Sequence, residues 1–202
     1  MIHPSAIIDP AAELDENVSV GPFCVIGADV HIGSGSEIGP HVVIKGATRI
    51  GQDNRVYQFA SVGEDPQDKK YAGERTLLKI GDRNVIREFV TINRGTLQDE
   101  GLTSIGNDNL FMAYVHVAHD CKVGNNVIMA NAASLGGHVQ IDDWAILGGF
   151  TLVHQFSRVG SYSFSAMGSA IGKDVPPYVM VDGKPAKPRG INAEGLKRHG
   201  FS

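Results

Sequence analysis

The sequence predicts an all-β chain wound as a single-stranded parallel β-helix. Three observations support this fold class: an aliphatic residue recurs at every sixth position, glycine occurs 25 times in 202 residues, and only 7% of residues are aromatic. A period of six fits neither the 3.6-residue turn of a helix nor the two-residue alternation of a strand. It fits a short strand followed by a corner. Three such sides form one coil, and about nine stacked coils would bury one aliphatic column.

The repeat runs through most of the chain. From Ile2 to Val62, eleven consecutive hexad positions are aliphatic, and six of them are followed directly by glycine. The repeat resumes over residues 80–92 and then, shifted by one residue, over 105–159; Ser165 interrupts it before Ile171. We expect glycine at corners where φ is unusual or space is short, and an interior too narrow for aromatic side chains.

Two polar segments interrupt the repeat and predict loops that project from the helix. They comprise residues 63–79 and 97–104, and loops that break a regular solenoid often carry function. The sequence therefore predicts a β-helix domain over residues 1–175 and an irregular tail over residues 176–202. A short helix is expected near Asn192–Arg198, with Asn192 as its N-cap.

Charge and composition restrict the class of protein. A net charge of −4 argues against general nucleic-acid binding, and the absence of any run of about 18 apolar residues argues against a membrane span. Residues 173–202 nonetheless carry a net charge of +3, which favours an acidic or phosphorylated partner. Two cysteines, and an N-terminus without a basic and apolar leader, predict a cytoplasmic protein with reduced thiols.

Three histidines fall on adjacent coils. His119, His138 and His154 lie in hexads that start 18 residues apart, so we expect them along one side of the helix, on rungs about 4.8 Å apart. They are candidates either for zinc binding or for general-base catalysis by a neutral imidazole. Asp120 follows His119, but adjacent strand residues face apart, so a His–Asp pair would need a local bend or a route across coils.

Linked motifs across almost the whole chain resemble the UDP-N-acetylglucosamine 3-O-acyltransferases of lipid A biosynthesis, which have the hexapeptide-repeat left-handed β-helix fold. They include Q-D-K-K-Y-A-G-E, V-A-H-D-C, G-G-H-V, V-H-Q-F and N-A-E-G-L-K-R-H-G-F-S. The resemblance implies transfer of an (R)-3-hydroxyacyl group from acyl carrier protein to the 3-hydroxyl of UDP-N-acetylglucosamine, the first step of that pathway. It also implies a homotrimer with active sites between subunits, and neither a metal nor a cofactor besides the thioester donor.

The same resemblance implies roles for single residues. His119 would be the general base, Asp120 would support it, and the backbone N–H of Gly137 would stabilise the oxyanion. Met167 in S-A-M-G-S would limit the acyl chain to about ten carbons. Substrate contacts would come from the first loop, the histidine-bearing coils and the tail, at Asp68, Lys70, His116, His138, His154, Gln155, Asn192, Glu194 and Arg198.

The sequence departs from the family pattern in three places. The family normally continues beyond G-F-S into a C-terminal helical domain, so we expect the tail to be the start of a truncated region. Asn93 stands where well-known relatives have histidine, and His199 stands where a second arginine is frequent. The histidine would weaken phosphate contacts at neutral pH, where it is mostly uncharged.

Three other functions are compatible with a β-helix. The N-acyltransferase that acts later in the same pathway carries an extra N-terminal domain, whereas the hexads here start at Ile2. A zinc hydro-lyase resembling the γ-class carbonic anhydrases would use the aligned histidines as ligands. A non-catalytic scaffold would need neither the inserted loops nor the histidines.

Overall fold

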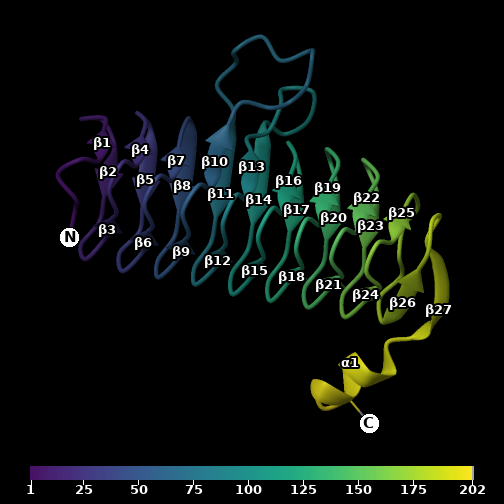
Figure 1. Ribbon diagram of the computed structural model, residues 1–202. Helices are drawn as coiled ribbons and strands as arrows, with labels where there is room; N and C mark the ends of the chain where they lie inside the picture. Colours follow the sequence, from purple (N-terminus) through teal and green to yellow (C-terminus); the bar gives the residue numbers. More distant parts are fainter. Residues whose placement is uncertain (202) are drawn as a thin grey trace.

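The computed structural model describes residues 1–201 and shows a prism of stacked coils in which most strands lie beside the strand three places along the chain (Figure 1). Three sheets form its sides. Sheet 1 contains β1 (Ile7–Ile8), β4 (Val25–Ile26), β7 (Val43–Ile44), β10 (Ser61–Glu64), β13 (Thr91–Asn93), β16 (His116–Val117), β19 (Ser134–Leu135), β22 (Leu152–Val153) and β25 (Ala170–Ile171). Sheet 2 contains β2 (Glu13–Leu14), β5 (Val30–Ile32), β8 (Ala47–Ile50), β11 (Leu77–Ile80), β14 (Leu102–Ile105), β17 (Lys122–Val123), β20 (Gln140–Ile141) and β23 (Arg158–Val159). Sheet 3 contains β3 (Ser19–Val20), β6 (Glu37–Ile38), β9 (Arg55–Val56), β12 (Val85–Ile86), β15 (Leu110–Phe111), β18 (Ile128–Met129), β21 (Ile146–Leu147), β24 (Phe164–Ser165), β26 (Val179–Asp182) and β27 (Lys187–Ile191).

From Val20 onward, the aliphatic residue of each hexad is buried inside the prism, which confirms the interpretation of the repeat. Val117 pairs in register with Leu135, and Leu135 pairs with Val153; all three side chains are buried. Full burial of one such side chain contributes about 1.5–3 kcal/mol. The column therefore supplies the main stabilisation of a fold that has almost no helix.

Two interior positions differ from the expectation. Phe111 occupies an inward hexad position and is fully buried, so the expectation that the interior excludes aromatic side chains is wrong at β15. Ser165 interrupts the aliphatic pattern but also points inward, where its hydroxyl lies 2.9 Å from Thr151 Oγ1. The hydrogen bond satisfies both buried hydroxyls, and the coil geometry continues unchanged.

The corners of the prism use left-handed backbone, mostly at residues other than glycine. Asp120 has φ of 58° and His138 has φ of 63°. Glycine occurs instead where successive coils approach closely: a Cβ on Gly33 would lie 2.6 Å from the carbonyl carbon of Gly51. Close approach rather than positive φ is therefore the reason for many of the hexad glycines.

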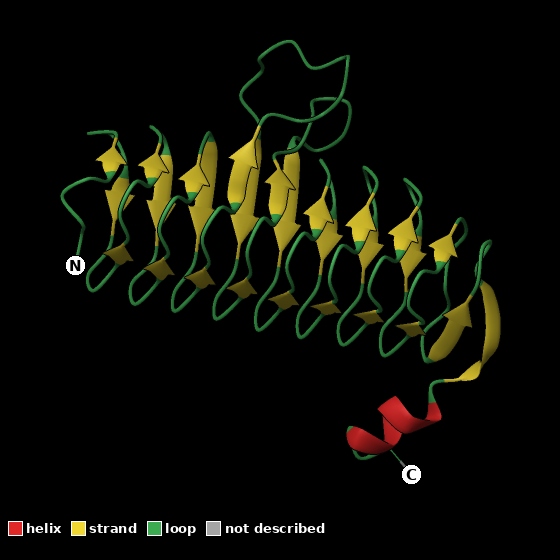
Figure 2. Ribbon diagram, in the orientation of Figure 1, coloured by secondary structure: helices red, strands yellow, loops and turns green. Residues whose placement is uncertain are grey.

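The segments outside the coils are two loops and the C-terminal tail, and they contain α1 (Ala193–Arg198), the one helix of residues 1–201 (Figure 2). The first loop runs from the end of β10 to the start of β11 and is shorter than the predicted interruption 63–79. The second joins β13 to β14 over residues 94–101, so it has the predicted length but begins three residues earlier than the predicted 97–104. Sheet 3 continues past residue 175, because β26 pairs in parallel with β24. Asn192 caps α1 by accepting a hydrogen bond from Gly195 N–H at 3.2 Å. No helix within these residues is long and apolar enough to cross a membrane.

Candidate active site

A histidine–aspartate pair lies on the corner between sheets 1 and 2. His119 follows β16, and the left-handed turn at Asp120 brings the two neighbouring side chains together. His119 Nδ1 lies 2.8 Å from Asp120 Oδ2. The local bend required by the sequence analysis is therefore present, and it occurs at the aspartate itself.

The carboxylate of Asp120 is held by the second loop. Its side chain is 1% exposed, and it accepts hydrogen bonds from the backbone N–H and the hydroxyl of Thr96, at 2.8 and 2.6 Å. The backbone N–H of Asp120 donates to Thr103 Oγ1 at 2.8 Å. These contacts leave the carboxylate little freedom to move away from His119.

The pairing determines the tautomer of His119. An ionised carboxylate only accepts hydrogen bonds, so neutral His119 carries its proton on Nδ1. Its Nε2 atom then has a free lone pair and forms no hydrogen bond within residues 1–201. This is the arrangement by which an aspartate orients a histidine as a general base.

The next coil places Gly137 and His138 against the same imidazole. His138 N–H donates to the carbonyl of His119 at 3.0 Å, which aligns the two corners. A Cβ on Gly137 would lie 2.5 Å from His119 Cε1, so a larger residue there would displace the imidazole. The N–H of Gly137 has no hydrogen-bond partner among the described residues and is available to an oxyanion beside the base.

His138 contacts His119, Asp99 and Phe156. Its ring meets that of His119 edge-on, with centroids 5.2 Å apart, and stacks on Phe156 at 4.4 Å. Its Nδ1 atom lies 2.8 Å from Asp99 Oδ2, and its Nε2 atom lies 3.9 Å from Asp120 Oδ2. The ligand atoms of His119, Asp120 and His138 lie within 4.8 Å of one another, a set that could hold a metal ion.

The three predicted histidines do not form one cluster. His154 is exposed on the following coil, and its Nδ1 atom interacts with the carbonyl of Gln155 at 3.0 Å. The corner residue of that coil is Phe156 and not His154, and the ring of Phe156 stacks on that of His138. A zinc site built from three imidazoles is therefore not assembled in the described residues.

His116 lies near the pair on the outer surface of sheet 1. Its Nδ1 atom lies 2.7 Å from Thr91 Oγ1 on the neighbouring strand. Burial, and then the charge of His119, lower the pKa of His116 below its usual 6.5. At neutral pH this side chain is accordingly an uncharged hydrogen-bonding group.

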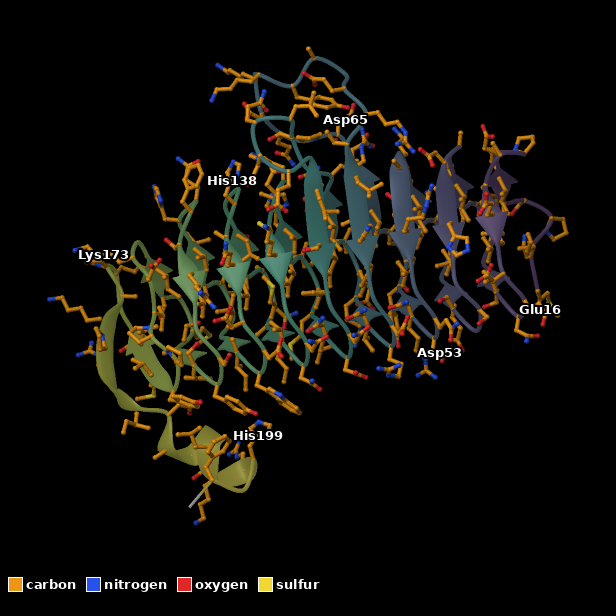
Figure 3. All side chains as sticks on the ribbon, turned by 180° about the vertical axis from the view of Figure 1, so that it is seen from behind. Glu16, Asp53, Asp65, His138, Lys173 and His199 are labelled. Carbon is orange, nitrogen blue, oxygen red and sulfur yellow. The ribbon has the colours of Figure 1, made fainter. Side chains whose placement is uncertain are left out.

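The first loop carries Asp68 and Lys70. Asp68 Oδ1 accepts a hydrogen bond from Lys70 N–H at 3.0 Å. The buried guanidinium of Arg94 anchors the loop through Asp65, Tyr71 Oη and the carbonyl of Gly63. Figure 3 shows Asp65 on the same side of the prism as His138.

The tail residues lie elsewhere in the chain. Helix α1, which follows Asn192 and contains Glu194 and Arg198, packs beside the corner between sheets 2 and 3, where the His199 ring lies 4.5 Å from that of Trp144. Figure 3 shows His199 on the opposite side of the prism from His138. Met167 is 76% exposed on the corner between sheets 3 and 1. Within one chain, these residues are not brought to His119.

The sequence analysis missed the residues that hold the pair in place. Thr96, Asp99 and Thr103 come from the second loop and β14, and all three contact Asp120 or His138. They lie 17–39 residues away from their partners and belong to no repeat position or motif. Only the path of the loop brings them to the corner.

A prism of hexapeptide coils with a histidine–aspartate pair on one corner defines a hexapeptide-repeat transferase. The family described as bacterial transferase hexapeptide (six repeats) matches residues 11–46 and 102–136. The second domain of the family described as UDP-N-acetylglucosamine O-acyltransferase matches residues 174–202.

Comparisons over the whole of this chain agree. The chain is 64% identical to the acyl-[acyl-carrier-protein]–UDP-N-acetylglucosamine O-acyltransferase of Saccharophagus degradans, covering all of this chain and 78% of that protein. It is 63% identical to the enzyme of the same name from Janthinobacterium sp., with coverage of 100% and 77%. The LpxA structure from Acinetobacter baumannii is 52% identical and superposes with a TM-score of 0.98 over all of this chain and 78% of that one. The chain belongs to the UDP-N-acetylglucosamine O-acyltransferase family. Its prism of coils is the left-handed β-helix of the hexapeptide-repeat fold.

Proposed function

We propose that this chain transfers an (R)-3-hydroxyacyl group from acyl carrier protein to the 3-hydroxyl of UDP-N-acetylglucosamine, the first step of lipid A biosynthesis. The family relationship supports the two substrates, which the relatives' names specify. The observation that carries the chemistry is the His119–Asp120 pair, whose free Nε2 atom is a suitable base for a hydroxyl. We expect the enzyme to act in the cytoplasm.

The reaction follows from the arrangement on this corner. His119 Nε2 takes the proton of the sugar 3-hydroxyl as its oxygen attacks the thioester carbonyl. The carbonyl oxygen becomes an oxyanion, to which the Gly137 N–H donates. The intermediate collapses to the ester as the C–S bond breaks, and the imidazolium of His119 returns its proton to the departing thiolate. Asp120 stabilises the positive charge that His119 carries between the two transfers.

A homotrimer accounts for the distribution of apolar surface. The exposed and partly exposed outward residues of sheet 2 are polar except for Leu77 and Leu102, whereas sheets 1 and 3 carry many exposed or partly exposed apolar side chains. The corner between sheets 3 and 1 bears a stack of five rings at 4.9–5.2 Å spacing: Phe23, His41, Phe59, Phe89 and Tyr114. Exposed apolar surface of this extent is typical of an interface. In the proposed trimer, sheet 3 of one subunit packs against sheet 1 of the next, with this corner at the three-fold axis.

The same arrangement explains where the tail acts. If sheet 3 of one subunit faces sheet 1 of its neighbour, the corner between sheets 2 and 3 meets the neighbour's corner between sheets 1 and 2. Helix α1 lies on the former corner and the His119–Asp120 pair lies on the latter. Asn192, Glu194 and Arg198 would then hold the UDP group beside the catalytic residues of another subunit. Asp68, Lys70, His116, His138, His154 and Gln155 would supply the remaining substrate contacts.

Replacement of the base tests the proposed function. We expect the wild type to convert UDP-N-acetylglucosamine and 3-hydroxyacyl carrier protein into the acylated sugar nucleotide, measured by mass spectrometry. His119→Ala should abolish transfer while the melting temperature and UDP-sugar binding stay close to wild type. His31→Ala is the matched control, because His31 pairs with Asp15 on sheet 2, away from the site. Substantial turnover by His119→Ala would refute the base assignment, and stoichiometric zinc in the purified protein would favour a hydro-lyase.

A further inference from the structure

The corner of the active site contains a second histidine–aspartate pair. His138 Nδ1 lies 2.8 Å from Asp99 Oδ2, the same separation as between His119 Nδ1 and Asp120 Oδ2. The hydrogen bond from His138 is the largest cause that lowers the pKa of Asp99 below its ordinary value. The carboxylate is therefore ionised at neutral pH and accepts the proton of Nδ1.

The loop holds Asp99 in this position. The backbone N–H of Asp99 donates to the carbonyl of Thr96 at 3.2 Å, and Thr96 itself is bound to Asp120. The next residue, Glu100, forms an ion pair with Lys122 on β17 at 2.9 Å. The turn that binds Asp120 thus also positions Asp99, whereas the ion pair of Glu100 and Lys122 lies between exposed side chains and contributes little.

The direction of His138 follows from these contacts. Stacking on Phe156 at 4.4 Å fixes the plane of the ring, and the Asp99 bond fixes which nitrogen points away from the site. The opposite nitrogen, Nε2, faces the Asp120 carboxylate at 3.9 Å, beyond hydrogen-bond distance. A donor group placed beside Nε2 would find an acceptor there.

We propose that Asp99 is a positioning residue that keeps the proton of neutral His138 on Nδ1, so that Nε2 accepts a hydrogen bond from an O–H or N–H group of the acyl-transfer substrates. The inference rests on the proposed function for the identity of the substrates, but the tautomer itself is a property of the protein alone. The two pairs then present two unprotonated Nε2 atoms on one corner. One serves as base, and the other orients the substrate.

Nitrogen NMR of the histidine side chains tests the tautomer without turnover. In protein labelled with ¹⁵N-histidine, with the His138 signals assigned through His138→Gln, we expect a protonated Nδ1 and an unprotonated Nε2 at pH above the imidazole pKa. In Asp99→Ala the proton should redistribute toward Nε2. A wild type with the proton on Nε2, or an unchanged pattern in Asp99→Ala, would overturn the proposal.

Kinetics test the consequence for the reaction. Loss of a hydrogen bond to a charged group predicts that Asp99→Ala lowers kcat/KM about tenfold or more. Asp99→Asn keeps an acceptor for Nδ1–H and should recover part of that loss. Glu100→Ala is the matched control: it removes the neighbouring clamp to Lys122 and should stay within about twofold of wild type, since it leaves the tautomer unchanged.

The outcomes separate the two proposals. Equal losses in Asp99→Ala and Glu100→Ala would show that only the anchoring of the loop matters, which contradicts a positioning role for Asp99. A wild type that fails to acylate any UDP sugar would refute the proposed function, while the tautomer measurement would still decide the role of Asp99.

Discussion

Asp120 Oδ2 lies 2.8 Å from His119 Nδ1 although the two residues are adjacent in the chain. Neighbouring side chains on a strand point to opposite faces, and the left-handed φ of 58° at Asp120 removes that restriction. His138 and Phe156 occupy the same corner position on the next two coils, with φ of 63° and 65°. The strained corner thus determines which side chains meet at the site.

Asp120→Asn should reduce kcat by roughly 10²-fold or more, because the amide loses the charge that stabilises the imidazolium and no longer specifies the tautomer of His119. Steady-state kinetics at saturating substrate measure the effect. An unchanged melting temperature would show that the variant is still folded around Thr96. A kcat within a few-fold of wild type would exclude Asp120 from the catalytic pair.

Gly137→Ala should inactivate the enzyme without unfolding it. The new Cβ would lie 2.5 Å from His119 Cε1, so the imidazole must shift, and a displacement of about 1 Å can cost roughly 10²-fold in rate. Gly172→Ala is the control, since a Cβ there meets nothing within 4 Å. Full activity in Gly137→Ala would show that the position of the ring is not critical.

Met167→Gly should shift the acyl preference toward longer chains, because the family resemblance implies that the Met167 side chain limits the length of the bound acyl chain. A panel of 3-hydroxyacyl carrier proteins of increasing length measures the preference of wild type and variant. Met167 is 76% exposed in the single chain, so the melting temperature of the subunit should change little. An unchanged length preference would refute this role.

Leu152→Asp should weaken the proposed trimer while leaving the subunit folded. Leu152 points outward from β22 on sheet 1 and is 54% exposed, so a charge there is tolerated in one chain but is costly when buried between subunits. Light scattering over a dilution series measures the mass. A Gln140→Asp variant on the polar face of sheet 2 should remain trimeric, and a monomeric wild type would contradict the assembly.

The depressed pKa of His116 predicts a stability that depends on pH. Burial lowers this pKa below 6.5 in the folded state, so the unfolded chain binds the proton first as pH falls. The free energy of unfolding should therefore be fully retained above about 6.5 and decline below it, toward the folded pKa. Denaturant unfolding between pH 7.5 and 5 should show a shallower decline in His116→Gln than in wild type; parallel curves would contradict the assigned shift.

The coil architecture could be predicted from the sequence alone. The hexad period specifies which residue of each side points inward, and Val117, Leu135 and Val153 are buried as that pattern predicts. The hexad period predicts which positions point inward, however, and not how large or how polar the side chain at each position can be. For that reason Phe111 fits inside, and Ser165 is accommodated through Thr151.

The site was predicted in part. Positions 18 or 19 residues apart lie on adjacent coils, which brings Gly137 and His138 to His119 as expected. The 18-residue coil also placed His154 on the following coil beside them, but the residue at the corner of that coil is Phe156, and its ring stacks on His138. The repeat determines the coil on which a residue lies, whereas the backbone torsion at each corner determines the direction in which its side chain points.

The sequence by itself determined the prism, its aliphatic column and the coils on which the histidines lie, because these follow from local periodicity and the burial of apolar side chains. Only the tertiary structure decided that Asp120 turns back onto His119 and that Asp99 reaches His138 from a loop 39 residues away. Those contacts depend on left-handed corner torsions and on the path of an irregular loop. The left-handed torsion recurs at regular six-residue intervals, but the aliphatic period does not show which side chain it brings onto a neighbour, and the path of the loop follows no repeat.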